Sequence, residues 1–231
     1  MNTIPRLADC DHPAVREKAY ELIHGKLTPL DKLESLFYFV RDGIRFGFPL
    51  KWDEVKASET LSYGLGYCNT KISLFLALCQ NSGIPARAHF GLLDICCMQG
   101  IFPSYSFRFL PKTGGHAWID VQLEGQWKPM DSYITDKAFY DGAVKRLKAS
   151  GFPFGYGVAP DTGKSSCEFN FGEKGFIFMG AIVEDHGAWE DAAEYYSSKK
   201  YMRLNAMQKM VYPMLAASTN RNIERIRSGM A

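Results

Sequence analysis

The chain has 231 residues, of which 46% are hydrophobic and 23% are charged, a composition typical of a globular protein that buries a core. Its net charge of +2 and the absence of a long basic run argue against a nucleic-acid surface, and no stretch approaches the ~20 apolar residues of a membrane span. The N-terminus has no apolar signal segment, so the six cysteines are expected to be free thiols in a cytoplasmic protein.

Two helices are expected before the first glycine-rich turn. Residues 13–24 carry apolar side chains at helical spacing. Thr28, Pro29 and Asp31 then match an N-cap, a first-turn proline and an acidic third position, which predicts a second helix whose apolar stripe continues to residue 44. Residues 52–61 are interpreted as a connector that leads to this turn.

The stretch from Gly64 to Asn81 predicts a central helix with Cys68 in its first turn. Apolar residues recur at i, i+3, i+4 and i+7 and also fill most of the opposite face, so the helix should be buried nearly all round. Because a helix N-terminus favours the thiolate, Cys68 is expected to have the lowest pKa of the six thiols. A lone cysteine is more often a small core residue, so this hypothesis needs partners.

The middle of the chain predicts an antiparallel sheet. Residues 86–93 are expected to form a strand, and residues 94–111 a loop with some strand. Residues 115–121 alternate with period two, which places His116, Trp118 and Asp120 on one face. A hairpin turn at 124–125 then leads into a strand over 126–133.

The last third carries fewer signals. A helix is expected over 135–147, a long ordered loop over 151–175, a short strand over 176–183, and mostly helical structure over 189–227 that is broken by Pro213. The loop is rich in glycine and proline, but Phe154 and Tyr156 argue against simple disorder.

His116 is the histidine best placed to act on a thiol. His12 and His24 are expected at the surface, His89 as a satisfied core residue and His186 in an exposed turn. If the turn at 124–125 closes a two-residue or four-residue hairpin, Asp131 lies on the face of His116 at a diagonal position, within reach of hydrogen bonding. A three-residue loop would place Asp131 on the other face. Asp120 shares the face but lies beyond Trp118.

Four motifs together resemble the transglutaminase-like superfamily over roughly residues 13–135. They are Gly66-Tyr67-Cys68, Gly83-Ile84-Pro85-Ala86-Arg87, Gly115-His116-Ala117-Trp118 and Trp127-Lys128-Pro129-Met130-Asp131. The resemblance implies a catalytic triad of Cys68, His116 and Asp131. It also implies an α+β, papain-like fold with a central helix on an antiparallel sheet, a catalytic core over 1–135, and a C-terminal helical extension over 136–231 packed on that core.

The implied chemistry is acyl transfer through a thioacyl-enzyme, with a peptide, protein or small amide, ester or thioester as substrate and no cofactor or metal. Water as acceptor gives a cysteine peptidase or amidase, and an amine gives a transglutaminase or amide synthase. A non-catalytic binding module that retains the fold is the alternative of another class, and a structural zinc protein is a weaker one. The sequence assigns neither the substrate nor the oligomeric state.

Five aromatic residues are predicted to bind substrate: Trp52, Tyr67, Trp118, Phe154 and Tyr156. The Cys68 backbone N–H is expected to be one oxyanion donor, and the Trp52 indole N–H is a candidate for the second. Cys96 and Cys97 lack a second cysteine pair, so a zinc site with His89 is disfavoured.

Overall fold

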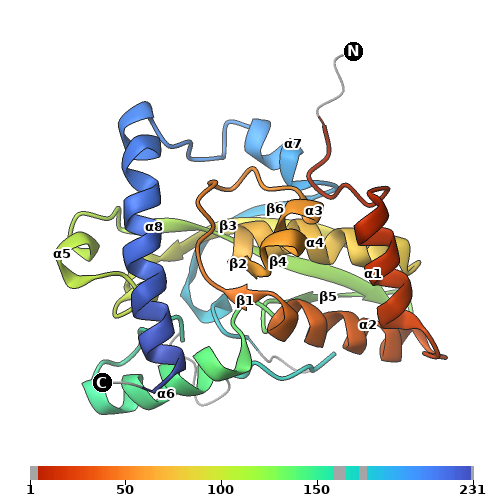
Figure 1. Cartoon of the computed structure of the whole chain (residues 1–231), viewed down its shortest axis with the longest axis horizontal. Coiled ribbons are helices and arrows are strands. Elements are labelled where there is room, and N and C mark those ends of the chain that lie inside the picture. Colours follow the sequence, from red (N-terminus) through yellow and green to blue (C-terminus); the bar gives the residue numbers. More distant parts are fainter. Residues whose placement is uncertain (1–4, 159–164, 172–175, 230–231) are drawn as a thin grey trace.

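The computed structural model of the chain describes residues 5–158, 165–171 and 176–229. A four-stranded antiparallel sheet with the order β5-β4-β3-β6 forms its centre. These strands are β3 (Ala86–Asp94), β4 (Thr113–Leu123), β5 (Gln126–Met130) and β6 (Ile182–Trp189). Helix α4 (Cys68–Asn81) packs on this sheet, so the fold is the expected α+β arrangement (Figure 1).

Helix α4 lies between the sheet and helices α1 (Pro13–Ile23), α2 (Pro29–Tyr38) and α3 (Ala57–Tyr63). Every residue from Cys68 to Cys79 is buried, as the apolar residues on both faces predicted. The Thr28 side chain accepts from the Asp31 N–H and thereby caps α2, which confirms the predicted start signal. The core therefore forms on both sides of α4.

The hairpin register agrees with the prediction. Glu124 and Gly125 both have positive φ angles and form a two-residue turn, and the strand pairs run from Leu123–Gln126 to Ile119–Met130. Strand β5 ends at Met130, three residues earlier than expected. Asp131 follows immediately, beside the part of β4 that carries His116.

Several connectors differ from the sequence interpretation. Residues 57–63 form helix α3, and a π-helical turn, η1 (Phe39–Gly43), follows α2. Short strands β1 (Arg45–Phe46) and β2 (Leu65–Gly66) pair in parallel. The 94–111 segment contains a 3₁₀ turn, η2 (Ile95–Met98), and a short helix, α5 (Ser104–Phe107), with no strand of its own.

The C-terminal part supplies α6 (Lys137–Ser150), η3 (Met179–Ala181), the edge strand β6, α7 (Ala192–Ser197) and α8 (Ala206–Arg227). The predicted strand over 176–183 is wrong in place, since β6 begins at Ile182. The predicted break at Pro213 is also wrong, because Pro213 lies inside α8. Contacts on both sides of it hold the helix: the Tyr212 hydroxyl donates to Pro49 O, and the Asn220 side chain bonds both backbone groups of Phe48. None of the described helices is both long and apolar enough to cross a membrane.

Candidate active site

Cys68 is the first residue of α4 and is buried. Its sulfur lies within hydrogen-bonding reach of the backbone N–H groups of Asn69 and Ala117. The thiol also lies 3.5 Å from the Asn69 side-chain oxygen, to which it donates. The N-terminus of the central helix thus meets the edge of β4 at the point where its pairing with β5 has ended.

The thiol of Cys68 is held in its neutral form in this closed site. Its pKa is raised to about 12, mainly by burial and to a smaller extent by the nearby carboxylates of Asp53 and Asp131, against the opposing N–H groups of Ala117 and Asn69. The expectation that the helix N-terminus gives Cys68 a low pKa is therefore wrong for this form, because desolvation outweighs the helix end. Removal of the thiol proton requires a base.

His116, on β4, lies directly beside Asp131. The His116 Nε2 atom is 3.7 Å from Asp131 Oδ2, and both side chains are fully buried. Neither ring nitrogen of His116 has a hydrogen-bond partner among the described residues. Nε2 faces the carboxylate, and Nδ1 is the other nitrogen of the ring.

The Asp131 carboxylate is fixed by two backbone donors. The N–H groups of Ile177 and Phe178 donate to its two oxygens at 2.8 Å each. The Phe178 ring also contacts the His116 imidazole, with centroids 5.1 Å apart. Sequence reasoning missed both residues and expected a strand here; their contribution is backbone N–H direction, which has no sequence signature.

Asp120 is bound elsewhere. Its Oδ2 atom accepts from Arg87 Nε at 3.2 Å and lies 2.9 Å from His89 Nδ1. His89 Nε2 bonds Asp185 at 2.7 Å, so His89 is satisfied, as expected. The geometry therefore pairs His116 with Asp131 and leaves Asp120 to a second cluster.

A polar cluster around Asp53 lies near Cys68. The buried Asp53 carboxylate accepts from the hydroxyls of Tyr67 and Tyr201, the latter at 2.8 Å, and the Trp52 indole N–H donates to Tyr201 at 2.9 Å. Burial raises the pKa of Asp53 despite these donors. The Trp52 N–H is thus engaged and does not serve as an oxyanion donor in this form. Sequence reasoning missed Asp53, which follows Trp52 directly.

Trp118 is a buried spacer between two histidines. It stacks on His89 with ring centroids 4.2 Å apart and on His116 with ring centroids 6.0 Å apart, and Trp118 is 2% exposed.

The prediction of an exposed turn at His186 is wrong: this histidine is buried on β6, where its Nδ1 bonds the Tyr195 hydroxyl at 2.9 Å.

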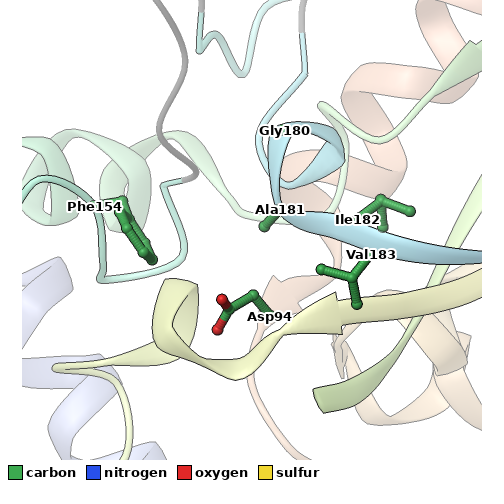
Figure 2. Close-up of a pocket in the computed structure, with 6 residues that line it drawn as sticks. All are labelled: Asp94, Phe154, Gly180, Ala181, Ile182 and Val183. Carbon is green, nitrogen blue, oxygen red and sulfur yellow. The ribbon is translucent and has the colours of Figure 1, made fainter. Parts of the chain in front are cut away.

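The loop after α6 lies beside a pocket. Phe154 lines it together with Asp94 at the end of β3 and four residues that span η3 and the start of β6, Gly180 to Val183. Figure 2 shows the Phe154 ring facing the Asp94 carboxylate. Tyr156 instead covers Gly100, where an added Cβ would lie 2.4 Å from the ring. Residues 159–164 and 172–175 of the predicted loop lie outside the described part of the chain.

The described residues contain no cluster of three or more histidine, cysteine or acidic side chains that could hold a metal ion. Cys96 is exposed and Cys97 is buried, while both nitrogens of His89 face carboxylates. These positions give no zinc-type arrangement of the three side chains.

Comparison with protein families gives one clear result. The family model described as the transglutaminase-like superfamily matches residues 16–132, about half of the chain. The match contains Cys68, His116 and Asp131. No curated protein matches the sequence.

Among solved structures, the chain is similar to one from Cytophaga hutchinsonii named a "Putative Cysteine Protease". The two share 18% sequence identity with a TM-score of 0.43, and the match covers 56% of this chain. It spans about two-fifths (39%) of the length of the Cytophaga protein.

Proposed function

Because this chain belongs to the transglutaminase-like superfamily, we propose that it is a thiol-dependent acyl-transfer enzyme with Cys68, His116 and Asp131 as its catalytic residues. The observation that carries the proposal is the orientation of His116: Nε2 faces an Asp131 carboxylate fixed by two backbone N–H groups, and Nδ1 has no partner among the described residues. This is the arrangement that a base needs to take a thiol proton.

The first half-reaction starts from the neutral thiol. As Cys68 Sγ attacks the carbonyl carbon of an amide, ester or thioester, its proton passes to His116 Nδ1, and Asp131 stabilises the resulting imidazolium. The imidazolium then protonates the leaving group, and a thioester to Cys68 remains. The Cys68 backbone N–H, at the start of α4, is proposed to stabilise the oxyanion.

The second half-reaction uses the same base. His116 removes a proton from water or an amine as it attacks the thioester, and then returns a proton to the Cys68 sulfur. Water makes the enzyme a hydrolase, and an amine makes it an amide-forming transferase. The catalytic groups are buried, so the aromatic cluster of Trp52, Tyr67 and Tyr201 must move for a substrate to reach them.

The test is direct detection of the acyl-enzyme. The purified protein is mixed with p-nitrophenyl acetate, and intact and peptide masses are recorded. We expect an acetyl group on Cys68, none in Cys68→Ala, and normal acetylation in the matched control Cys96→Ala. A protein that forms no Cys68 adduct is a binding module. Adding a primary amine then separates the two acceptors, because the acetyl group leaves either as acetate or as the acetamide of that amine.

Substrate binding by the loop is proposed for Phe154 rather than Tyr156. Phe154 lines the pocket, whereas Tyr156 fills the space over Gly100. Phe154→Ala should raise KM or alter the choice of ester while leaving Tm unchanged. Tyr156→Ala should lower Tm with little change in KM. The reverse pattern would exclude the loop pocket from substrate selection.

A further inference from the structure

Lys71 is a buried cation one helical turn beyond Cys68. Its residue is 0% exposed, and no carboxylate forms a salt bridge with it among the described residues. Its ammonium instead donates to three backbone carbonyls: Val40 O at 2.8 Å, Arg41 O at 3.1 Å and Tyr133 O at 3.3 Å. The mechanism proposed above does not use this group.

The number of acceptors matches the charged form. An ammonium has three N–H donors and so satisfies all three carbonyls, whereas a neutral amine has two donors and would turn its lone pair toward the third oxygen. Burial opposes the charge and lowers the pKa of Lys71 to about 7. The proton on this group is therefore held only loosely near neutral pH.

The charges around Lys71 come from three elements. Asp136 at the N-cap of α6 and Asp42 in η1 favour the ammonium, while Arg227 of α8 and Arg41 of η1 oppose it. Asp136 is already engaged in a salt bridge with Arg227 at 2.7 Å. Asp42 is the more exposed of the two acids, so its charge can be removed with less disturbance of the core.

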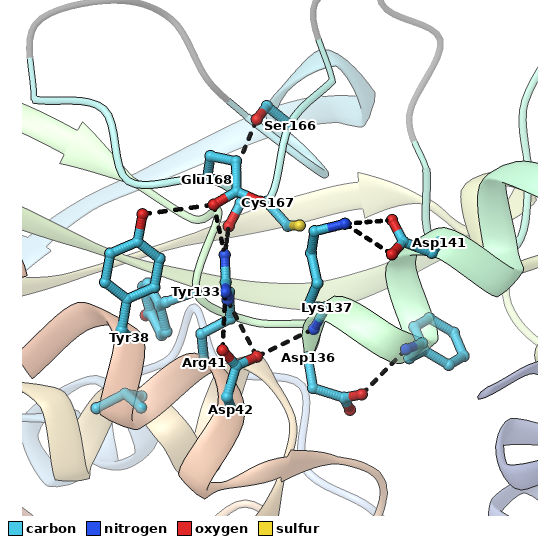
Figure 3. A network of polar contacts seen from close by, with 12 residues as sticks. Tyr38, Arg41, Asp42, Tyr133, Asp136, Lys137, Asp141, Ser166, Cys167 and Glu168 are labelled. Carbon is cyan, nitrogen blue, oxygen red and sulfur yellow. Dashed lines mark hydrogen bonds and ion pairs between the residues drawn. The ribbon is translucent and has the colours of Figure 1, made fainter. Parts of the chain in front are cut away.

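The carbonyls that Lys71 binds belong to η1 and to the chain just after Asp131. Tyr133 follows Asp131 by two residues. Arg41, in the π-helical turn, donates from its guanidinium to Cys167 O at 2.8 Å and to Glu168 at 3.0 Å (Figure 3).

We propose that Lys71 is a positioning residue: its ammonium joins the helix that carries Cys68 to η1 and to the chain just after Asp131, so that loss of its proton loosens the contact between His116 and Asp131 and slows turnover. This inference rests on the proposed function, since it regulates the same site. Tyr133 O accepts the longest of the three bonds and is the partner released when the third donor is lost. The protonated form of Lys71 is the competent one.

The experiment compares Lys71→Met with the control Lys18→Met, which removes a lysine that pairs with Glu21 on α1. Methionine keeps the apolar volume without the charge, and replacing a buried charge by an apolar group is often neutral or stabilising. We expect an unchanged or higher Tm for Lys71→Met but deacetylation of Cys68 slowed on the order of 10- to 100-fold, with the KM for p-nitrophenyl acetate unchanged.

The pH profile separates positioning from a structural role. Wild-type deacetylation should fall as pH rises through about 7, the pKa of Lys71. In Lys71→Met this decline should be absent. Should Lys71→Met not fold, Asp42→Asn decides the matter: removing the charge that favours the ammonium should move the decline to lower pH.

Two results would overturn the role of Lys71. One is a fall in deacetylation rate that occurs at the same pH in Asp42→Asn as in the wild type. The other is a Lys71→Met enzyme with the wild-type rate and pH profile. Failure of the proposed function looks different. In that case Cys68 is not acetylated in any variant, or acetylation persists in Cys68→Ala.

Discussion

Two histidine–aspartate clusters lie on one face of the sheet, separated by Trp118, and they differ in how completely their hydrogen bonds are satisfied. His89 binds Asp120 and Asp185 through both ring nitrogens, at 2.9 and 2.7 Å. His116 is buried, and its one ion-pair contact among the described residues, with Asp131, is 3.7 Å long.

The difference separates an imidazole whose nitrogens are both bonded from the one proposed to move a proton. Burial alone would lower the pKa of His89, but its bonds to Asp120 and Asp185 outweigh burial and raise the pKa. An imidazole with a carboxylate on each nitrogen has no nitrogen left for a substrate. Both ring nitrogens of His116 are buried without a hydrogen-bond partner among the described residues, and Nδ1 is the one proposed to act on the thiol.

The largest effect is expected from Asp131→Asn. The amide cannot stabilise the His116 imidazolium and favours the wrong tautomer, so the deacetylation rate should fall by about 10⁴-fold while the fold is kept. Stopped-flow measurement with p-nitrophenyl acetate gives the rate, and circular dichroism checks the fold.

Asp120→Asn is the matched control in the other cluster and should change the rate less than about threefold, since the side-chain partners of Asp120 among the described residues are His89 and Arg87. If Asp120→Asn is the more damaging of the two variants, the assignment of the two clusters is reversed.

Because the site around His116 is buried, we expect the Cys68 thiol to react slowly with alkylating reagents. In the resting protein, the exposed Cys96 should react with iodoacetamide at least about tenfold faster than Cys68, because burial raises the pKa of Cys68 to about 12.

Tyr201→Phe removes the hydroxyl that joins Trp52 to Asp53 and should speed labelling of Cys68 several-fold. The control Tyr105→Phe alters an exposed hydroxyl. Peptide mass spectrometry measures each site, and preferential labelling of Cys68 at pH 6 would show that the helix end, rather than burial, controls this thiol.

The smallest effect is expected from His89→Gln, and it is an effect on stability. Because the folded-state pKa of His89 is raised, its stabilisation is fully present below the unfolded pKa of about 6.5 and is lost as pH rises through the folded value. His89→Gln should lower Tm by about 2–4 °C at pH 5.5 and by less at pH 9, with catalysis nearly unchanged. Thermal melts at the two pH values test this sign, and an equal loss at both would mean that the charge of His89 does not contribute.

The sequence alone determined the parts of this protein that depend on local rules. The buried helix beginning at Cys68, the capped start of α2 and the two-residue hairpin follow from periodicity, capping and turn chemistry. The hairpin register placed Asp131 on the face of His116, because side chains on a strand alternate with a fixed period of two.

Only the tertiary structure decided how that site is held and closed. The Ile177 and Phe178 N–H groups reach Asp131 across more than forty residues of chain, and Tyr201 meets Trp52 and Asp53 from still farther away. The Cys68 pKa likewise reflects what surrounds the helix end. Backbone direction and desolvation are properties of packed neighbours, so no local pattern in the sequence encodes them.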